Sequence, residues 1–217
     1  MISLTIRKKL ISLSSHEQGL ATAAHARSAL APEFQAAIAS RTTETSVSQV
    51  ISESTLERMV VKYSEQLVFQ PLQEIRYWFT YSSGAFLEPG YPPLYYGRDR
   101  NRTVSPNKSA VSAIGEAIAG FLAQRLYGCT KLARPNHDYP DIVMEGQDMT
   151  FLVEAKATLR SEGDQIETVV DDELPRLASL TSSARLLDVR PVRGLLIGTT
   201  LISEVEYFCY MVELELV

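Results

Sequence analysis

The sequence predicts an α/β fold, in which a mixed central sheet is flanked by helices and preceded by a mainly helical N-terminal extension. Three observations support this prediction. Residues 109–127 have the apolar spacing of an amphipathic helix, and three short strand-like segments follow them. A second helical segment, 165–187, comes next, and two apolar strand-like segments end the chain. This alternation of helices and strands is typical of a mixed α/β domain.

Local signals place the elements of a domain at 105–217. Gly128 directly follows the first helix, where a left-handed residue commonly ends one. Gly146-Gln147 is suited to a two-residue hairpin turn. Pro175 interrupts the second helical segment and marks a point where it could kink. Strands are expected at 129–133, 141–145, 150–158, 194–201 and 206–217.

Residues 1–104 are expected to form a separate, mainly helical extension that serves DNA recognition or dimerisation. Helical patterns cover 16–40, 53–69 and 72–79. A stretch rich in Ser and Thr at 41–48 breaks the pattern, and a segment rich in Gly, Pro and Tyr at 82–107 predicts an irregular loop or hairpin region.

The composition excludes several classes of protein. The chain has 217 residues, of which 45% are hydrophobic and 22% are charged, so it has enough apolar material for a core. Cys129 and Cys209 are too few for a disulfide scaffold or a tetrahedral sulfur site. No apolar run approaches about 18 residues, and the first residues lack the apolar region of a secretory signal. We therefore expect a cytoplasmic protein that does not enter a membrane.

The charge is distributed unevenly. Residues 1–104 carry 11 Lys and Arg against 9 Asp and Glu, whereas residues 105–217 carry 10 against 17, and the net charge is −5. A protein that coats DNA by charge alone is usually basic overall. The balance still allows an enzyme whose acidic residues hold metal ions beside a basic binding surface.

Three acidic segments stand out in the second half of the chain. Glu116 is the only charged residue between Ser109 and Gln124, and it lies opposite the apolar stripe of its helix. Asp141 follows Pro140 at the entrance of a strand, where Asp is unfavourable. Glu154 and Lys156 lie two residues apart, on one face of the next strand. Each also has a structural interpretation: a solvated Glu, a turn-capping Asp and a surface ion pair.

The predicted hairpin brings the last two segments together. With Gly146-Gln147 as the turn, Asp141 pairs with Leu152 and lies diagonal to Glu154, within roughly 7–8 Å on the same face. Two carboxylates this close repel each other unless a cation lies between them. Mg²⁺ prefers such an oxygen site with one or two carboxylates and several waters. A neighbouring lysine can orient the attacking water, and the arrangement suits hydrolysis of a phosphodiester.

Pro140-Asp141, twelve intervening residues and then Glu154-Ala155-Lys156 resemble the PD-(D/E)xK signature of restriction-endonuclease-like nucleases. Glu116 resembles the extra acidic residue that many members carry on the preceding helix. The resemblance covers roughly 105–202, and the order of elements resembles the α-β-β-β-α-β core of that family. It implies that Asp141, Glu154 and the backbone carbonyl of Ala155 bind Mg²⁺, with Mn²⁺ as a substitute.

The same resemblance gives each residue a role in a metal-dependent DNA endonuclease of the restriction or defence type. Asp141, Glu154, Lys156 and Glu116 form the catalytic set, in which Glu116 assists metal binding and Lys156 positions the attacking water. We expect DNA as the partner, together with a homodimer, because cutting both strands requires two sites. The residues expected to bind nucleic acid are Arg98, Arg100, Arg102 and Lys108, which follow Tyr95-Tyr96 in the densest basic stretch.

Two other functions stay open on the sequence alone. The first is a catalytically silent module with the nuclease fold that binds nucleic acid or a protein partner, since a fold does not fix a function. The second is a purely structural α/β protein with surface ion pairs. The intact set of Asp, Glu and Lys favours the enzyme, because a module without catalysis need not keep it.

Overall fold

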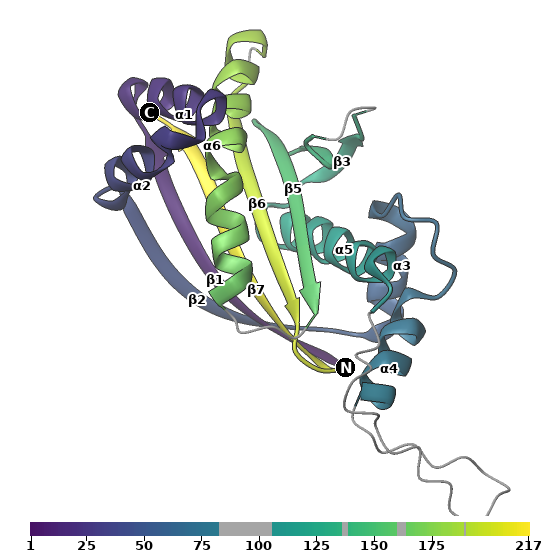
Figure 1. The fold of residues 1–217 in the computed structure, drawn as a ribbon. Coiled ribbons are helices and arrows are strands. Elements are labelled where there is room, and N and C mark those ends of the chain that lie inside the picture. The colour runs from purple at the N-terminus through teal and green to yellow at the C-terminus, as the bar shows by residue number, and fades with distance from the viewer. Residues whose placement is uncertain (83–105, 136–138, 160–163, 189) are drawn as a thin grey trace, which may run out of the picture.

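Seven strands form one mixed sheet in the computed structural model, which describes residues 1–82, 106–135, 139–159, 164–188 and 190–217 (Figure 1). The order across the sheet is β2-β1-β7-β6-β5-β4-β3. The strands are β1 (Ile2–Leu13), β2 (Thr42–Ile51), β3 (Thr130–Ala133), β4 (Ile142–Glu145), β5 (Thr150–Leu159), β6 (Val192–Leu201) and β7 (Glu206–Leu216).

The sheet combines parallel and antiparallel pairs. β1 pairs with β7 in parallel, and β5 pairs with β6 in parallel. The pairs β1–β2, β3–β4, β4–β5 and β6–β7 are antiparallel. Parallel neighbours need a long crossover connection, and α6 (Asp164–Leu187) is the helix that connects β5 to β6.

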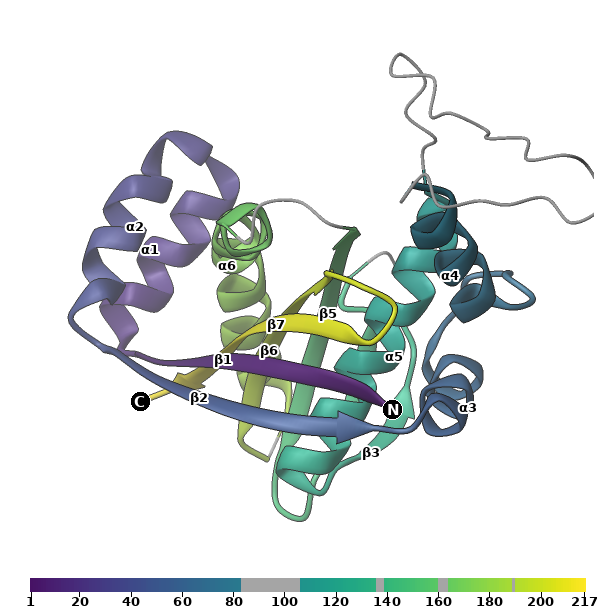
Figure 2. The same ribbon diagram turned by 90° about the horizontal axis from the view of Figure 1, so that it is seen from below.

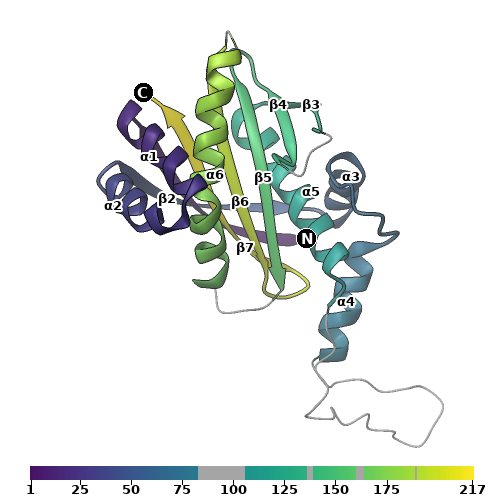
Figure 3. The same ribbon diagram turned by 45° about the horizontal axis from the view of Figure 1, so that its top comes forward.

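Helices cover both faces of the sheet. Figures 2 and 3 show α1 (Ser15–Ala26) and α2 (Ala31–Ala39) beside α6, away from the helices of the other face. A three-residue 3₁₀ turn, Ser28–Leu30, joins α1 to α2. The other face carries α3 (Glu53–Tyr63), α4 (Pro71–Ser82) and α5 (Lys108–Tyr127). None of the helices in the described part of the chain is long and apolar enough to cross a membrane.

The alternation of side chains along each strand produces two hydrophobic clusters. On β5, Phe151 and Val153 belong to the cluster under α3, α4 and α5, whereas Leu152 belongs to the cluster under α6. Successive strand residues point to opposite faces. Glu154 and Lys156 therefore share the α6 face with Leu152.

α5 lies directly against β5 because its contact surface is made of small residues. A Cβ added at Gly115 would lie 2.5 Å from the Cβ of Ala157 on β5. Asn107 caps the start of the helix, where its side chain accepts hydrogen bonds from the N–H groups of Ser109 and Ala110. Gly128 ends it at φ 63°, in the left-handed region.

The elements predicted for 105–217 are confirmed, from the helix at 109–127 to the last strand. The structure therefore has the predicted α/β class, with a mixed sheet flanked by helices. The predicted order also holds, since α5, β3, β4, β5, α6, β6 and β7 follow one another along the chain.

Residues 1–104 form helices α1 to α4 in the segments predicted to be helical, but they also form two long strands that the sequence did not predict. Residues 2–13 form β1, with Ile2, Leu4 and Ile6 buried. The predicted break at 41–48 lies within β2 instead. β1 lies between β2 and β7, so one sheet and one core include residues from both sides of residue 104. The predicted boundary at residue 104 therefore separates no independent domain.

The packing of α5 on β5 predicts opposite effects for two glycine substitutions. Alanine favours a helix over glycine by about 1 kcal/mol. Gly19→Ala on α1 has nothing within 4 Å of the new Cβ, so the free energy of unfolding should rise by up to that amount. Gly115→Ala should lower it by about 1 kcal/mol, because overpacking against Ala157 outweighs the gain. Denaturant titration measures both, and an increase in the Gly115→Ala variant would contradict this packing.

Candidate functional site

The candidate site begins where Pro140 ends the ladder between β4 and β5. The last pair of that ladder is Ile142 with Val153. The next hydrogen-bonded pair would join Ala155 to Pro140, because such pairs alternate along antiparallel strands. Proline has no N–H group, so it cannot donate to the carbonyl of Ala155. This carbonyl is therefore left at the open edge of β5.

The register of this hairpin differs from the predicted one. Glu145 pairs with Thr150 rather than with Asp148, so the loop holds four residues, 146–149, instead of two. The N–H of Gly146 closes it by donating to the carbonyl of Met149. The shift is two residues along β5, and a shift of two keeps each side chain on its face. Asp141 therefore still meets Glu154, directly across rather than diagonally.

Asp141 and Glu154 replace the missing ladder bonds with their carboxylates. The N–H of Ala155 donates to Oδ2 of Asp141 at 2.7 Å. The N–H of Asp141 donates to Oε2 of Glu154 at 3.1 Å. Glu154 is only 3% exposed, whereas Asp141 is partly exposed. Backbone donors thus fix two acidic side chains side by side at the start of β4.

Burial and mutual repulsion disfavour the charged forms of both carboxylates. Burial raises the pKa of Glu154 to about 7, and the negative charge of Asp141 acts in the same direction. Burial also raises the pKa of Asp141; the N–H of Ala155 opposes that rise, and the charge of Glu116 adds to it. A cation beside both carboxylates would favour their charged forms.

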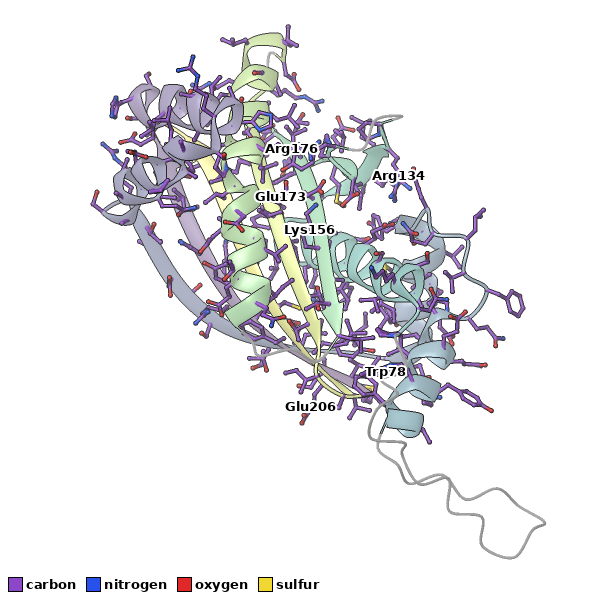
Figure 4. All side chains as sticks on the ribbon, viewed as in Figure 1. Trp78, Arg134, Lys156, Glu173, Arg176 and Glu206 are labelled. Atoms are coloured by element: carbon purple, nitrogen blue, oxygen red, sulfur yellow. The ribbon has the colours of Figure 1, made fainter. Side chains whose placement is uncertain are left out.

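Lys156 supplies one positive charge from the same face of β5 (Figure 4). Its ammonium nitrogen lies 2.8 Å from Oε1 of Glu154 and 3.7 Å from Oε1 of Glu173 on α6. Burial lowers the pKa of Lys156, but the hydrogen bond and charge of Glu154 and the charge of Glu173 outweigh it, so the pKa is raised. Lys156 is therefore a cation at neutral pH and can donate hydrogen bonds.

Arg176 and Tyr139 pack against each other beside this network. The guanidinium of Arg176 lies 4.0 Å from the centroid of the Tyr139 ring, a distance at which a cation and an aromatic face attract. Arg176 also pairs with Glu173, at 3.9 Å. The hydroxyl of Tyr139 is buried and has no hydrogen-bond partner among the described residues. Burial raises its pKa, with a further contribution from the charge of Glu154.

Glu116 is buried on α5, at 6% exposure, and both of its oxygens accept hydrogen bonds. Oε2 accepts from the N–H of Glu65 at 3.0 Å and from Arg134 at 3.1 Å, and Oε1 accepts from Gln66 at 3.2 Å. The charges of Glu116 and Arg134 both act on the pKa of Asp141, in opposite directions. Arg134 pairs with the Glu116 carboxylate. Direct metal binding by Glu116 stays a prediction.

The residues expected to bind nucleic acid are only partly within the described structure. Lys108 is exposed at the first position of α5. Arg98, Arg100 and Arg102 lie outside the described residues.

Sequence reasoning missed two charged residues that shape the site. Glu173 falls within the apolar stripe of α6, between Val170 and the pair Leu174 and Leu177. A carboxylate at such helical spacing, here the last of the acidic run 171–173, is a signal that could have identified it. Arg134 has no comparable signal, because its partners Glu116 and Glu65 come from distant segments.

The donor set at this site suits a hard divalent cation. It offers two carboxylates and the Ala155 carbonyl, and Mg²⁺ is commonly bound by one or two carboxylates with waters completing its shell. Within the described ranges, no three His, Cys, Asp or Glu side chains gather closely enough to hold a metal by themselves. Asp141, Glu154 and the Ala155 carbonyl are thus the residues that would hold such an ion.

The chain matches no known protein family, no curated protein and no solved structure in comparisons with each of them.

The raised pKa of Glu154 predicts a pH-dependent cost of its charge. Well below pH 4.5 this residue is protonated in both the folded and unfolded states. The cost builds up as the pH rises from about 4.5, where the unfolded residue ionises, to about 7, where the folded residue does, and it is complete above that. Without divalent cations, Glu154→Gln should therefore gain stability relative to wild type across that window. The gain should reach roughly 3 kcal/mol, at about 1.4 kcal/mol per pKa unit. Urea titrations at about pH 4 and pH 8 measure it; a difference independent of pH would refute the shift.

Proposed function

We propose that this chain is a Mg²⁺-dependent nuclease of the PD-(D/E)xK type that hydrolyses phosphodiester bonds of DNA. One observation carries the proposal. The ladder between β4 and β5 ends at Pro140, and Asp141, Glu154 and the Ala155 carbonyl lie at that end with Lys156 beside them. The order of elements from α5 to β6 agrees with the restriction-endonuclease-like core that the motif implies.

Each residue has a role that follows from its position. A divalent cation held by Asp141, Glu154 and the Ala155 carbonyl would supply positive charge that polarises the phosphodiester. The ammonium of Lys156 donates a hydrogen bond that holds the attacking water against the phosphate. Glu173 limits the positions of that ammonium, because it attracts Lys156 from the α6 side. Arg134 partly offsets the negative charge of Glu116 near Asp141.

Three cations beside the site support a nucleic-acid substrate, although α3 also carries Glu53 and Glu57. Arg58 and Lys62 lie one turn apart on α3, and the ammonium of Lys131 on β3 donates to the carbonyl of Lys62 at 2.9 Å. None of these three forms an ion pair with a carboxylate in the described structure, although the chain is acidic overall. β3 leads directly to Arg134, so these cations lie next to the Glu116 end of the site. Unpaired cations of this kind bind phosphates.

The deciding experiment is cleavage of plasmid, linear duplex and single-stranded DNA with Mg²⁺, Mn²⁺ or EDTA. Wild type should cut with either metal and not with EDTA. Asp141→Asn, Glu154→Gln and Lys156→Ala should each reduce the rate by at least about 100-fold, because each removes a charge at the reacting phosphate. Asp148→Asn, an exposed residue of the 146–149 loop, is the matched control and should cut normally.

Binding separates the enzyme from the silent module. The three inactive variants should still bind DNA in Ca²⁺ or EDTA, since contacts that position the backbone do not require the chemistry. A purified wild type that binds DNA but cuts none with any divalent metal would support the binding module. Cleavage that survives Asp141→Asn would place the active site elsewhere in the chain.

A further inference from the structure

β2 is the outermost strand on one side of the sheet, and its outer edge is unpaired within the described residues (Figure 2). Most of its ten residues are exposed, including Val47 at 41% and Val50 at 57%. Soluble proteins usually protect such an edge with lysine, proline or a bulge. β2 contains no lysine, arginine or proline, and its register with β1 is unbroken from Thr42 to Ile51.

The register with β1 shows which backbone groups face the open edge. The N–H of Ser12 donates to the carbonyl of Arg41 at 3.4 Å, and these residues continue the register of the β1–β2 ladder. Hydrogen-bonded pairs alternate along an antiparallel ladder. Odd-numbered residues of β2 therefore bond to β1. The residues whose N–H and carbonyl groups face outward are Thr42, Glu44, Ser46, Ser48 and Val50.

We propose that a second copy of this chain pairs with this edge, β2 against β2 in antiparallel orientation, with Ser46 opposite Ser46. This register uses all five outward residues. Thr42 lies opposite Val50, and Glu44 lies opposite Ser48. The two sheets then form one continuous sheet across a twofold axis, which is the commonest symmetry of homo-oligomers.

The side chains of β2 favour a copy of itself as the occupant. Glu44 is the only charged residue of the strand, and in this register it faces a serine hydroxyl rather than the partner's carboxylate. Like charges directly opposite each other would destabilise the pair. Short Ser and Thr side chains lie at the centre, so the backbones can approach without a steric clash. Six of the ten residues are Thr, Val or Ile, which are enriched in paired strands.

Mass measurement in solution tests the pairing, and it does not depend on nuclease activity. Wild type should have twice the chain mass of 24.1 kDa in light scattering and sedimentation. Ser46→Pro removes an outward N–H and leaves the bonds to β1 intact, so it should be monomeric with an unchanged circular dichroism spectrum. Ser54→Pro, in the first turn of α3, should remain dimeric. A monomeric wild type, or a dimeric Ser46→Pro variant, would overturn the proposal.

A disulfide test fixes the register even if the proline variant fails to fold. Opposed residues of a hydrogen-bonded pair have Cα atoms about 5.5 Å apart, within reach of a disulfide. Both native cysteines are buried, so Ser46→Cys adds the only exposed thiol among the described residues. Mild oxidation should convert it to a covalent dimer at low protein concentration, whereas Ser54→Cys, at an exposed position of α3, should stay monomeric on a denaturing gel. Equal cross-linking of both variants, or of neither, would contradict pairing through β2.

Discussion

The site depends on one missing hydrogen bond. Pro140 has no N–H to donate at the position where the ladder between β4 and β5 would continue, so the ladder stops at Ile142 and Val153 while β5 runs on. The carbonyl of Ala155 therefore lacks its ladder donor, and the N–H of Ala155 donates to the side chain of Asp141 instead. In exchange, Glu154 receives the N–H of Asp141. A proline thus leaves the Ala155 carbonyl without a ladder donor next to two carboxylates that are held by backbone N–H groups.

Charge around this point is balanced in two separate networks. Glu154, Lys156 and Glu173 form one network on the α6 face, and Glu116 and Arg134 form the other from α5 and the end of β3. Arg176 balances Glu173, so the excess negative charge of the first network comes from Asp141 beside Glu154, which agrees with the raised pKa of Glu154. In the second network, Arg134 pairs with buried Glu116 and with Glu65, whose side chain is mostly exposed to solvent. The shortage of positive charge therefore lies at Asp141 and Glu154, where the proposed cation would bind.

Local patterns predicted the second half of the chain well because its elements are encoded by local signals. Gly128 ends α5, Pro140 precedes β4, and the apolar stripe of α5 is unbroken. The hairpin loop was predicted two residues too short, yet the paired face was correct because strand side chains alternate with a period of two. β2 was missed because its mostly exposed Ser and Thr residues resemble a loop, and only the neighbouring β1 makes it a strand. Arg134 and Glu173 reach the site from segments whose position depends on the fold, so their roles needed the structure.

The central claim is that Asp141 and Glu154 together hold a divalent cation, and a calorimetric titration of Mg²⁺ in the absence of nucleic acid tests it most directly. Wild type should bind one ion per chain. Asp141→Asn should show no binding over the same concentrations, while its circular dichroism spectrum and melting curve stay those of a folded protein. Equal binding by wild type and Asp141→Asn, or no binding by folded wild type, would contradict the account.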